Sequence, residues 1–598
     1  MEPHWPTLLA ARTDGASWID KFIVDRTEDI CRFVESIRGY GRCTAISRCR
    51  SGYNVILRLR WENTDARDWA IRIPIPENSV FMEEKIRNEI VMLTYLDTYT
   101  TIPIPKIYRA GAAEDNPTGL GPFIVTNWIK GRNLVKVLKE QNLLAPNGFD
   151  ITPEGEEILR HVYGQIAGFL LQLWTHDFDK IGAIGIDEEI EGYEVIYPPL
   201  TLYMNELVRR YGIRKNSLPQ QTYSHSYEYF NSLFGLQWAH VVLQKNSVKN
   251  STDAREKFSV RAIMVHLART FVNQRGDESP FKLFCDDFSL SNILVDENFQ
   301  ITGITDWGFT YAAPPQFASS CPWWLMVWSP DKIIQKVGVS RFRDAYSCQF
   351  SIFINQLKLR ELERGMQDPD TLSSKMVASF VDHGGWFILA CRMGAIVDDI
   401  YWKLLDNACW GRGFSRDTRM LFFSTKASDL VLFIRDREVF VEGKIRDLIE
   451  YCQRMGIPCT ERYKPESLVK PHIVMGDKMT QTSLEGFNED NENTNTIDDG
   501  DDEDINDEDT SNTLVWQPIR QPFDPILFYE NRENYEIRSI GTQTDHEQLQ
   551  SAGPEEEPQC RPEPQEEKTS NDYTGAWSAL TAISLLVFAV FAGRCQQG

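Results

Sequence analysis

The chain has 598 residues, 42% of them hydrophobic, and a formal net charge of −23. At about 150 residues per domain, this length allows up to roughly four domains with large cores. Residues 481–513 hold thirteen Asp and Glu and no Lys or Arg, so more than half of the net charge lies in one acidic tract. The rest of the chain is only mildly acidic and lacks the basic face of a nucleic-acid-binding protein, so we expect no nucleic-acid partner.

Twelve cysteines are scattered along the chain, without a Cys-x-x-Cys pair and without a neighbouring cluster of His. This pattern indicates neither a zinc site nor a disulfide scaffold. The N-terminus lacks a basic start followed by an apolar run, so no secretory signal is predicted. We therefore expect reduced thiols and a cytoplasmic location for the folded part of the chain.

The N-terminal part is predicted to be rich in strands. Residues 1–35 read as a helical lead-in, and from residue 41 alternating apolar and polar residues predict two strands, with a third strand over 69–75. The first two strands are interrupted around Gly52, where backbone amides could be aimed at phosphates. An ordinary hairpin turn explains the same interruption.

A helix is predicted over residues 79–95, with Asn78 or Ser79 as its cap. Glu89 falls on the apolar stripe of this helix. Because a carboxylate facing the core is costly unless it is paired, we predict that Glu89 pairs with Arg72 of the preceding strand. A purely structural salt bridge would account for the pair equally well.

A further strand over residues 122–129 ends in Lys130 and Gly131, after which the sequence becomes helical. This strand is similar to a hinge between two lobes, although an edge strand running into a turn is an equal alternative. The helices that follow are predicted over 133–141, 156–175, 202–272, 346–362, 373–398 and 439–455.

The chemistry-bearing stretch lies within the helical part, at residues 284–307. Asp287 precedes Asn292 by five positions, and two β-prone runs joined by a polar turn then lead to Asp306. The two runs predict a hairpin, which would bring Asn292 and Asp306 to one end with Asp287 in the loop before them. Two carboxylates and an amide can supply a proton acceptor and ligands for Mg²⁺, as phosphoryl transfer requires. Taken alone, the same spacing also fits a polar turn before a strand.

The C-terminal part is different in composition. Residues 476–574 are polar and acidic and are predicted to be disordered, because they cannot bury enough apolar surface to offset the entropy of ordering. Residues 576–593 are free of charge and largely apolar, and their length is at the short end for a membrane-spanning helix. We predict a tail anchor in an intracellular membrane; a buried helix is the alternative. The acidic tail is a candidate surface for a protein partner.

With these motifs in this order, the chain resembles the aminoglycoside phosphotransferase family, and in particular fungal proteins that carry that domain. The resemblance covers about residues 36–470 and includes Ala-Ile-Arg-Ile-Pro at 70–74 and Thr-Asp-Trp at 305–307. It implies an α+β, two-lobed kinase-like fold, with a β-rich lobe over 36–128 and a helical lobe over 129–475. It also implies that ATP and Mg²⁺ bind between the lobes.

The resemblance assigns a role to each motif position. Asp287 would be the catalytic base, and Asn292 and Asp306 the metal ligands. Arg72 would contact the α- and β-phosphates while Glu89 holds it. The ATP-binding positions are Arg72, Glu89, Gly52 and the backbone of Asn127 and Ile129, which would receive the adenine.

Three departures from the family pattern stand out. Cys285-Asp286 replaces the usual His-Gly before the base, Arg72 replaces a Lys, and Gly308 replaces a common acidic residue. Two functions therefore stay open. One is an ATP- and Mg²⁺-dependent kinase acting on a hydroxyl of an unidentified small molecule. The other is a weak or inactive pseudokinase, a membrane-tethered nucleotide-binding module.

Overall fold

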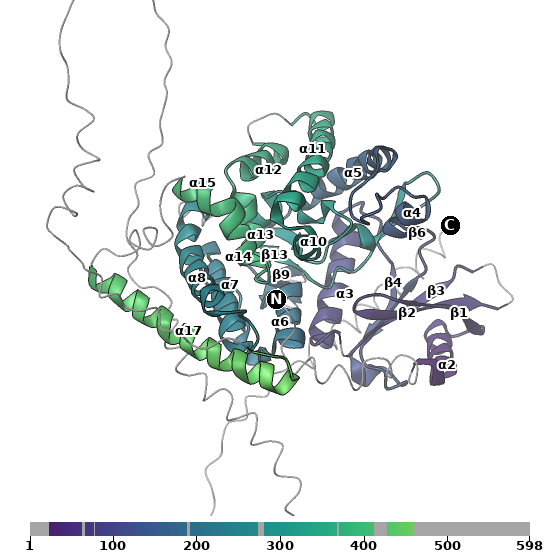
Figure 1. Cartoon of the computed structure of the whole chain (residues 1–598). Coiled ribbons are helices and arrows are strands. Elements are labelled where there is room, and N and C mark those ends of the chain that lie inside the picture. The colour runs from purple at the N-terminus through teal and green to yellow at the C-terminus, as the bar shows by residue number, and fades with distance from the viewer. Residues whose placement is uncertain are drawn as a thin grey trace, which may run out of the picture.

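The computed structural model describes residues 23–62, 66–76, 78–187, 192–272, 280–366, 370–411 and 427–459. In these ranges a sheet-rich N-terminal lobe lies beside a larger helical lobe (Figure 1), which confirms the predicted α+β class. The predicted acidic linker and the predicted tail anchor lie outside the described residues. Of the helices in the described ranges, none is both long and apolar enough to cross a membrane.

The N-terminal lobe is built on one five-stranded antiparallel sheet in the order β1-β2-β3-β5-β4. Its strands are β1 Cys43–Arg50, β2 Asn54–Trp61, β3 Trp69–Pro74, β4 Ile107–Gly111 and β5 Phe123–Asn127. Helix α2 (Thr27–Arg38) packs on one face, where Ile71 and Val125 belong to its core. Helix α3 (Met82–Tyr99) packs on the other face against Ile124. Because side chains alternate along a strand, Arg72 points from β3 towards α3.

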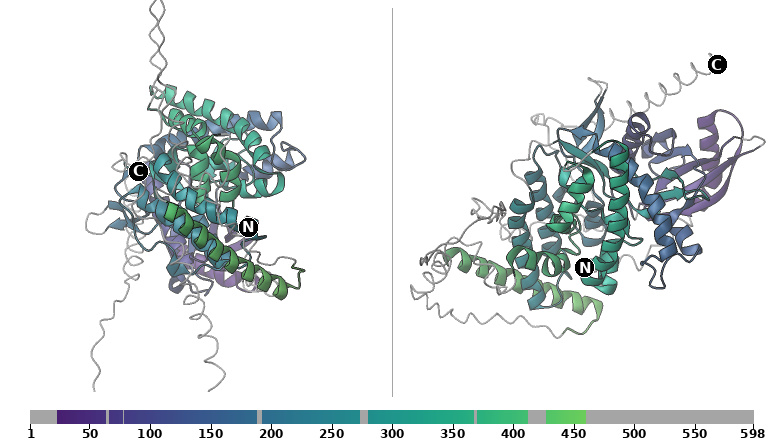
Figure 2. Two further views of the ribbon diagram at one scale, coloured as in Figure 1. Left: turned by 60° about the vertical axis from the view of Figure 1, so that its left-hand side comes forward. Right: turned by 90° about the horizontal axis from the view of Figure 1, so that it is seen from above.

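The C-terminal lobe is mainly helical, with small sheets inserted. Its helices are α4 Leu134–Glu140, α5 Pro153–Trp174, α6 Leu202–Tyr211, α7 Ser226–Leu243, α8 Ser251–Phe271, α9 Pro315–Ser319, α10 Pro330–Val337, α11 Val339–Glu363, α12 Leu372–Val381, α13 Gly384–Arg392, α14 Val397–Ile400, α15 Asp406–Trp410 and α17 Ala427–Met455. Its strands are β6 Arg132–Asn133, β7 Asp177–Phe178, β8 Ala183–Asp187, β9 Gly192–Tyr197, β10 Phe281–Cys285, β11 Ile293–Val295, β12 Ile301–Ile304 and β13 Thr310–Ala313. Helix α5 packs on α11, and α17 lies across α8 (Figure 2).

The start of α3 differs from its prediction. The helix begins at Met82, and Phe81 precedes it without a side-chain cap, so neither Asn78 nor Ser79 is the cap. Asn78 instead donates from Nδ2 to the carbonyl of Gly52 at 2.8 Å. Asn78 therefore stabilises the turn between β1 and β2 rather than the end of a helix.

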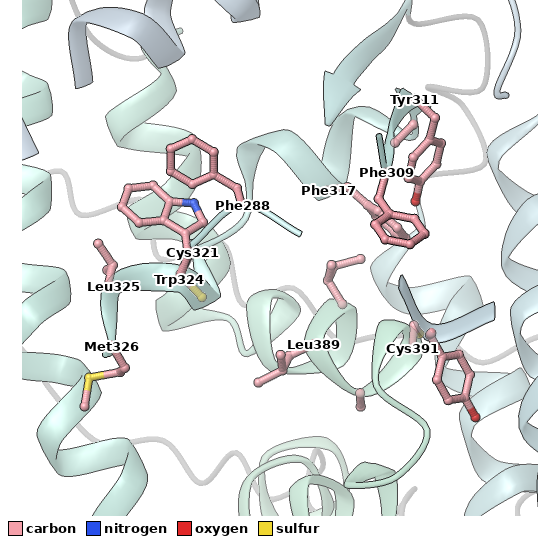
Figure 3. Packing of buried hydrophobic residues seen from close by; sticks show 14 of the residues in the cluster. Phe288, Phe309, Tyr311, Phe317, Cys321, Trp324, Leu325, Met326, Leu389 and Cys391 are labelled. Atoms are coloured by element: carbon pink, nitrogen blue, oxygen red, sulfur yellow. The ribbon is translucent and has the colours of Figure 1, made fainter. Parts of the chain in front are cut away.

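Aromatic packing holds the segment that carries Asp287. Phe288, directly after Asp287, lies edge-on to Trp324 with ring centroids 5.0 Å apart. Phe309 and Tyr311 lie further along, where the chain leaves the Asp306 loop (Figure 3). All four rings are nearly fully buried, so both ends of the segment are fixed by the core of the C-terminal lobe.

Candidate active site

The hairpin predicted after Asp287 is present. Strands β11 and β12 pair antiparallel with Ile293 opposite Ile304. At the open end, the amide of Thr305 donates to the carbonyl of Asn292 at 3.0 Å. Asn292, directly before β11, and Asp306, shortly after β12, therefore lie at the same end of the hairpin, as the sequence predicts.

Arg72 connects this hairpin to the N-terminal lobe. Its guanidinium forms an ion pair with Glu89 on α3, and its Nη1 lies 2.9 Å from Oδ1 of Asp306. Glu89 also accepts a hydrogen bond from the amide of Trp307 at 3.3 Å. Arg72 and Glu89 are buried. The predicted pair is thus formed, and it extends across the lobes to the predicted metal ligand.

The predicted site residues lie around one cleft of about 1330 Å³ between the lobes. The cleft is lined by Gly52, Arg72, Asn127, Ile129, Asp287, Asn292 and Asp306, among others. Glu89 stands behind Arg72 and is nearly inaccessible to solvent. The structure therefore brings together residues as distant in sequence as Arg72 and Asp306, which are 234 positions apart.

The carboxyl of Asp287, the predicted catalytic base, has a raised pKa. Burial, together with the neighbouring Asp306 carboxylate, raises the pKa of Asp287 to about 8, while the Lys85 ammonium acts in the opposite direction. Asn292 donates from Nδ2 to the Asp287 carbonyl at 2.9 Å and fixes the loop. A carboxylate with a pKa near the working pH is well matched to accepting a proton from a hydroxyl.

The two lobes, the ion pair between β3 and α3, and the hairpin that leads to Asp306 surround one cleft. This is the two-lobed arrangement that the sequence predicts. No known family model matches the chain. Among curated proteins, it is similar to "Altered inheritance of mitochondria protein 9, mitochondrial" of Candida glabrata, 26% identical over 136 residues, 22% of this chain and 21% of that protein. The protein of the same name from Meyerozyma guilliermondii is 25% identical over 121 residues, 20% of this chain and 18% of that protein. The match spans about a fifth of the length of these relatives.

Solved structures similar to this chain include phosphotransferases and kinases. One is an aminoglycoside phosphotransferase mutant in ternary complex with ADP and hygromycin B, at 11% identity and a TM-score of 0.30, covering 61% of this chain and 98% of that one. Another is an ethanolamine kinase of Plasmodium vivax, at 11% identity and a TM-score of 0.33, covering 71% of this chain and 84% of that one.

The structure shows what Cys285 and Asp286, the two departures from the family pattern before Asp287, contact. Asp286 accepts a hydrogen bond from the amide of Leu202 at 2.8 Å and from Nε of Arg392 at 3.1 Å. Asp286 is therefore paired with Arg392 and anchors the loop to α6 and α13. Burial raises the pKa of the Cys285 thiol to about 12, and the thiol donates weakly to the Asp306 carbonyl, at 3.9 Å.

Asn54 is a site residue that the sequence did not reveal. Its Nδ2 donates to Oδ1 of Asp306 at 3.1 Å, and its Oδ1 is buried without a hydrogen-bond partner in the described part of the chain. Asp306 has φ 64°, a left-handed conformation that is costly for a non-glycine residue. The bonds from Arg72 and Asn54 hold the carboxylate in this position. The sequence offers one signal for Asn54: it is the last residue of the break around Gly52 that separates the first two predicted strands.

The donor set suits a magnesium ion shared with phosphates. Asp306 supplies a carboxylate. Within the described chain, Asn292 makes a side-chain hydrogen bond only through Nδ2, so its Oδ1 is available to bind the metal. Among the described residues, no group of three or more His, Cys, Asp or Glu could hold a metal by itself. Mg²⁺ is commonly held by one or two protein side chains together with substrate phosphates, so the residues present fit this ion.

Asn127 and Ile129, at and just after the end of β5, are the two backbone positions predicted to receive adenine, and one of them is available. The amide of Asn127 already donates to the carbonyl of Lys106 at 3.1 Å. The amide of Ile129 has no hydrogen-bond partner within the ranges described, and Ile129 lines the cleft. Of the two predicted positions, the Ile129 amide is therefore the one that could donate a hydrogen bond to an adenine ring.

Proposed function

We propose that this chain transfers the γ-phosphate of ATP to a hydroxyl of a small molecule, with Mg²⁺ as the metal. The observation that carries the proposal is the connection from Glu89 through Arg72 to Asp306 along the cleft that Asp287 also lines. Such an arrangement supplies the positioning and the charge stabilisation that dominate catalysis of phosphoryl transfer.

Each residue has a separate task in this mechanism. Asp287 accepts the proton of the acceptor hydroxyl, and its raised pKa makes it a stronger base than an ordinary carboxylate. Asp306 and Asn292 would hold Mg²⁺, which neutralises charge on the phosphates when bound. Arg72 contacts the phosphates, and Glu89 keeps its guanidinium in place.

The test is release of ADP from Mg·ATP by the full chain, first with water as acceptor and then with a panel of hydroxyl-bearing metabolites. We expect Asp287→Asn to reduce turnover by about 10²- to 10⁴-fold, the usual contribution of a general base. Asp179→Asn, at an exposed position outside the cleft lining, is the control and should match the parent. Equal rates for the parent and Asp287→Asn would show that the base is assigned wrongly.

A second function, nucleotide binding without turnover, is favoured by one observation. Oδ1 of Asp306 already accepts hydrogen bonds from Arg72 and Asn54, so two side chains compete with a metal for this oxygen. Stabilisation by Mg·ATP without ADP release from any acceptor would support this binding module over the kinase.

A further inference from the structure

Lys85 is a buried cation that the roles above do not use. It lies in the first turn of α3, and only 1% of the residue is exposed. Its Nζ has no hydrogen-bond partner among the described residues. The ammonium instead lies 5.2 Å from the centroid of the Tyr53 ring and 5.3 Å from that of Phe309. Tyr53 belongs to the β1–β2 turn, and Phe309 follows the Asp306 loop.

Gly308 makes room for this lysine. A Cβ at position 308 would lie 2.7 Å from Cγ of Lys85 and 3.1 Å from its backbone carbonyl oxygen. A side chain at this position would therefore collide with the lysine side chain and make a tight contact with the backbone of α3. The glycine at 308, two residues after Asp306 in the chain, is therefore what allows Lys85 to be buried here.

Charge explains why an unpaired ammonium is tolerated there. Burying a lone ammonium costs several kcal/mol unless opposite charge compensates it. Asp287, Asp306 and Glu89 bring three carboxylates to this region, and Arg72 is the guanidinium bonded to two of them. Asp286 is already paired with Arg392. The Lys85 ammonium acts on Asp287 in the direction that lowers the pKa of that carboxyl, so it opposes the remaining negative charge.

We propose that Lys85 is a positioning residue that acts as a fixed counter-charge of the nucleotide–metal site and lets the cleft bind ATP without a divalent ion. The proposal rests on the proposed function, since it takes the cleft to be a nucleotide site. Removing the lysine charge leaves the site more negative by one unit. The site then attracts Mg²⁺ more strongly and repels metal-free ATP, so the two affinities move in opposite directions.

The experiment compares the full-length parent with Lys85→Met by calorimetric titration. One titrant is Mg²⁺ alone, and the other is ATP in the presence of EDTA. For one unit charge acting through partly buried surroundings, we expect metal-free ATP to bind about tenfold more weakly and Mg²⁺ severalfold more tightly in the variant. Lys85→Gln, a second neutral replacement, should reproduce both changes and serves if the Met variant does not fold.

Lys444→Met is the matched control. Lys444 is also fully buried, but it donates to the carbonyls of Val242 and Gln244 and forms an ion pair with Asp447 at 2.9 Å. None of these partners lines the cleft. This variant should be less stable without shifting the two affinities in opposite directions. If the parent binds Mg·ATP but the Lys85 variants change both affinities in one direction, or neither, the counter-charge role is wrong. If the parent binds no Mg·ATP, the proposed function itself fails.

Discussion

Asp286 departs from the family pattern, yet it stabilises the loop before Asp287 through an ion pair with Arg392. In the sequence it is an additional carboxylate beside Asp287, the proposed base. In the fold it is 6% exposed and bonded to Arg392 and to the amide of Leu202. The loop is thus supported by an ion pair. Nothing in the sequence near Asp286 marks Arg392 as its partner, because the two are 106 positions apart.

A double-mutant cycle measures this ion pair. Arg392→Met leaves a buried carboxylate without its cation, which we expect to lower the free energy of unfolding by about 3–5 kcal/mol. The double variant Asp286→Asn/Arg392→Met should be less destabilised than the sum of the two single variants, as determined by urea unfolding. Additive losses would show that the two side chains are not coupled.

At the scale of elements, the sequence predicted the β-rich lobe, the α3 segment and the hairpin after Asp287. These elements have clear periodicity or strong turn signals, and their partners lie nearby in the chain. The cap of α3 was predicted wrongly, because Asn78 is used by the Gly52 carbonyl instead. Asn54 and Lys85 were missed because their importance depends on contacts with the Asp306 loop, more than 200 positions away.

Helix α6 forms one wall of the cleft, and its start is capped. Thr201 accepts a hydrogen bond from the amide of Met204 at 3.1 Å, while the next amide, Leu202, donates to Asp286. We expect Thr201→Ala to cost about 1 kcal/mol in the free energy of unfolding.

Thr201→Ser is the control for this cap, since it keeps the hydroxyl. It should restore most of the lost stability in the same urea unfolding experiment. An equal loss for Ser and Ala would mean that the buried methyl group, not the cap, makes the contribution.

At the scale of the whole molecule, polar contacts hold the two lobes together beside the cleft. Tyr53 of the β1–β2 turn donates to Glu206 of α6 at 3.1 Å, and the amide of Val80 donates to Asn205 at 3.0 Å. Together with Arg72 and Asp306, these contacts place the turn over the region where phosphates would lie. Binding of a nucleotide to this arrangement should stabilise both lobes at once, because it acts on the native state and not on the unfolded chain.

The most direct test of a nucleotide–metal site is the thermal unfolding of the full chain with Mg·ATP, for the parent and for Asp306→Asn. At a nucleotide concentration about 100 times Kd, the parent should gain about 2.7 kcal/mol in the free energy of unfolding. Asp306→Asn should lose the part of this gain that depends on Mg²⁺ and keep the part seen with ATP in EDTA. A parent that gains no stability from millimolar Mg·ATP, or a parent and a variant that respond identically to Mg²⁺, would contradict the assignment of this cleft.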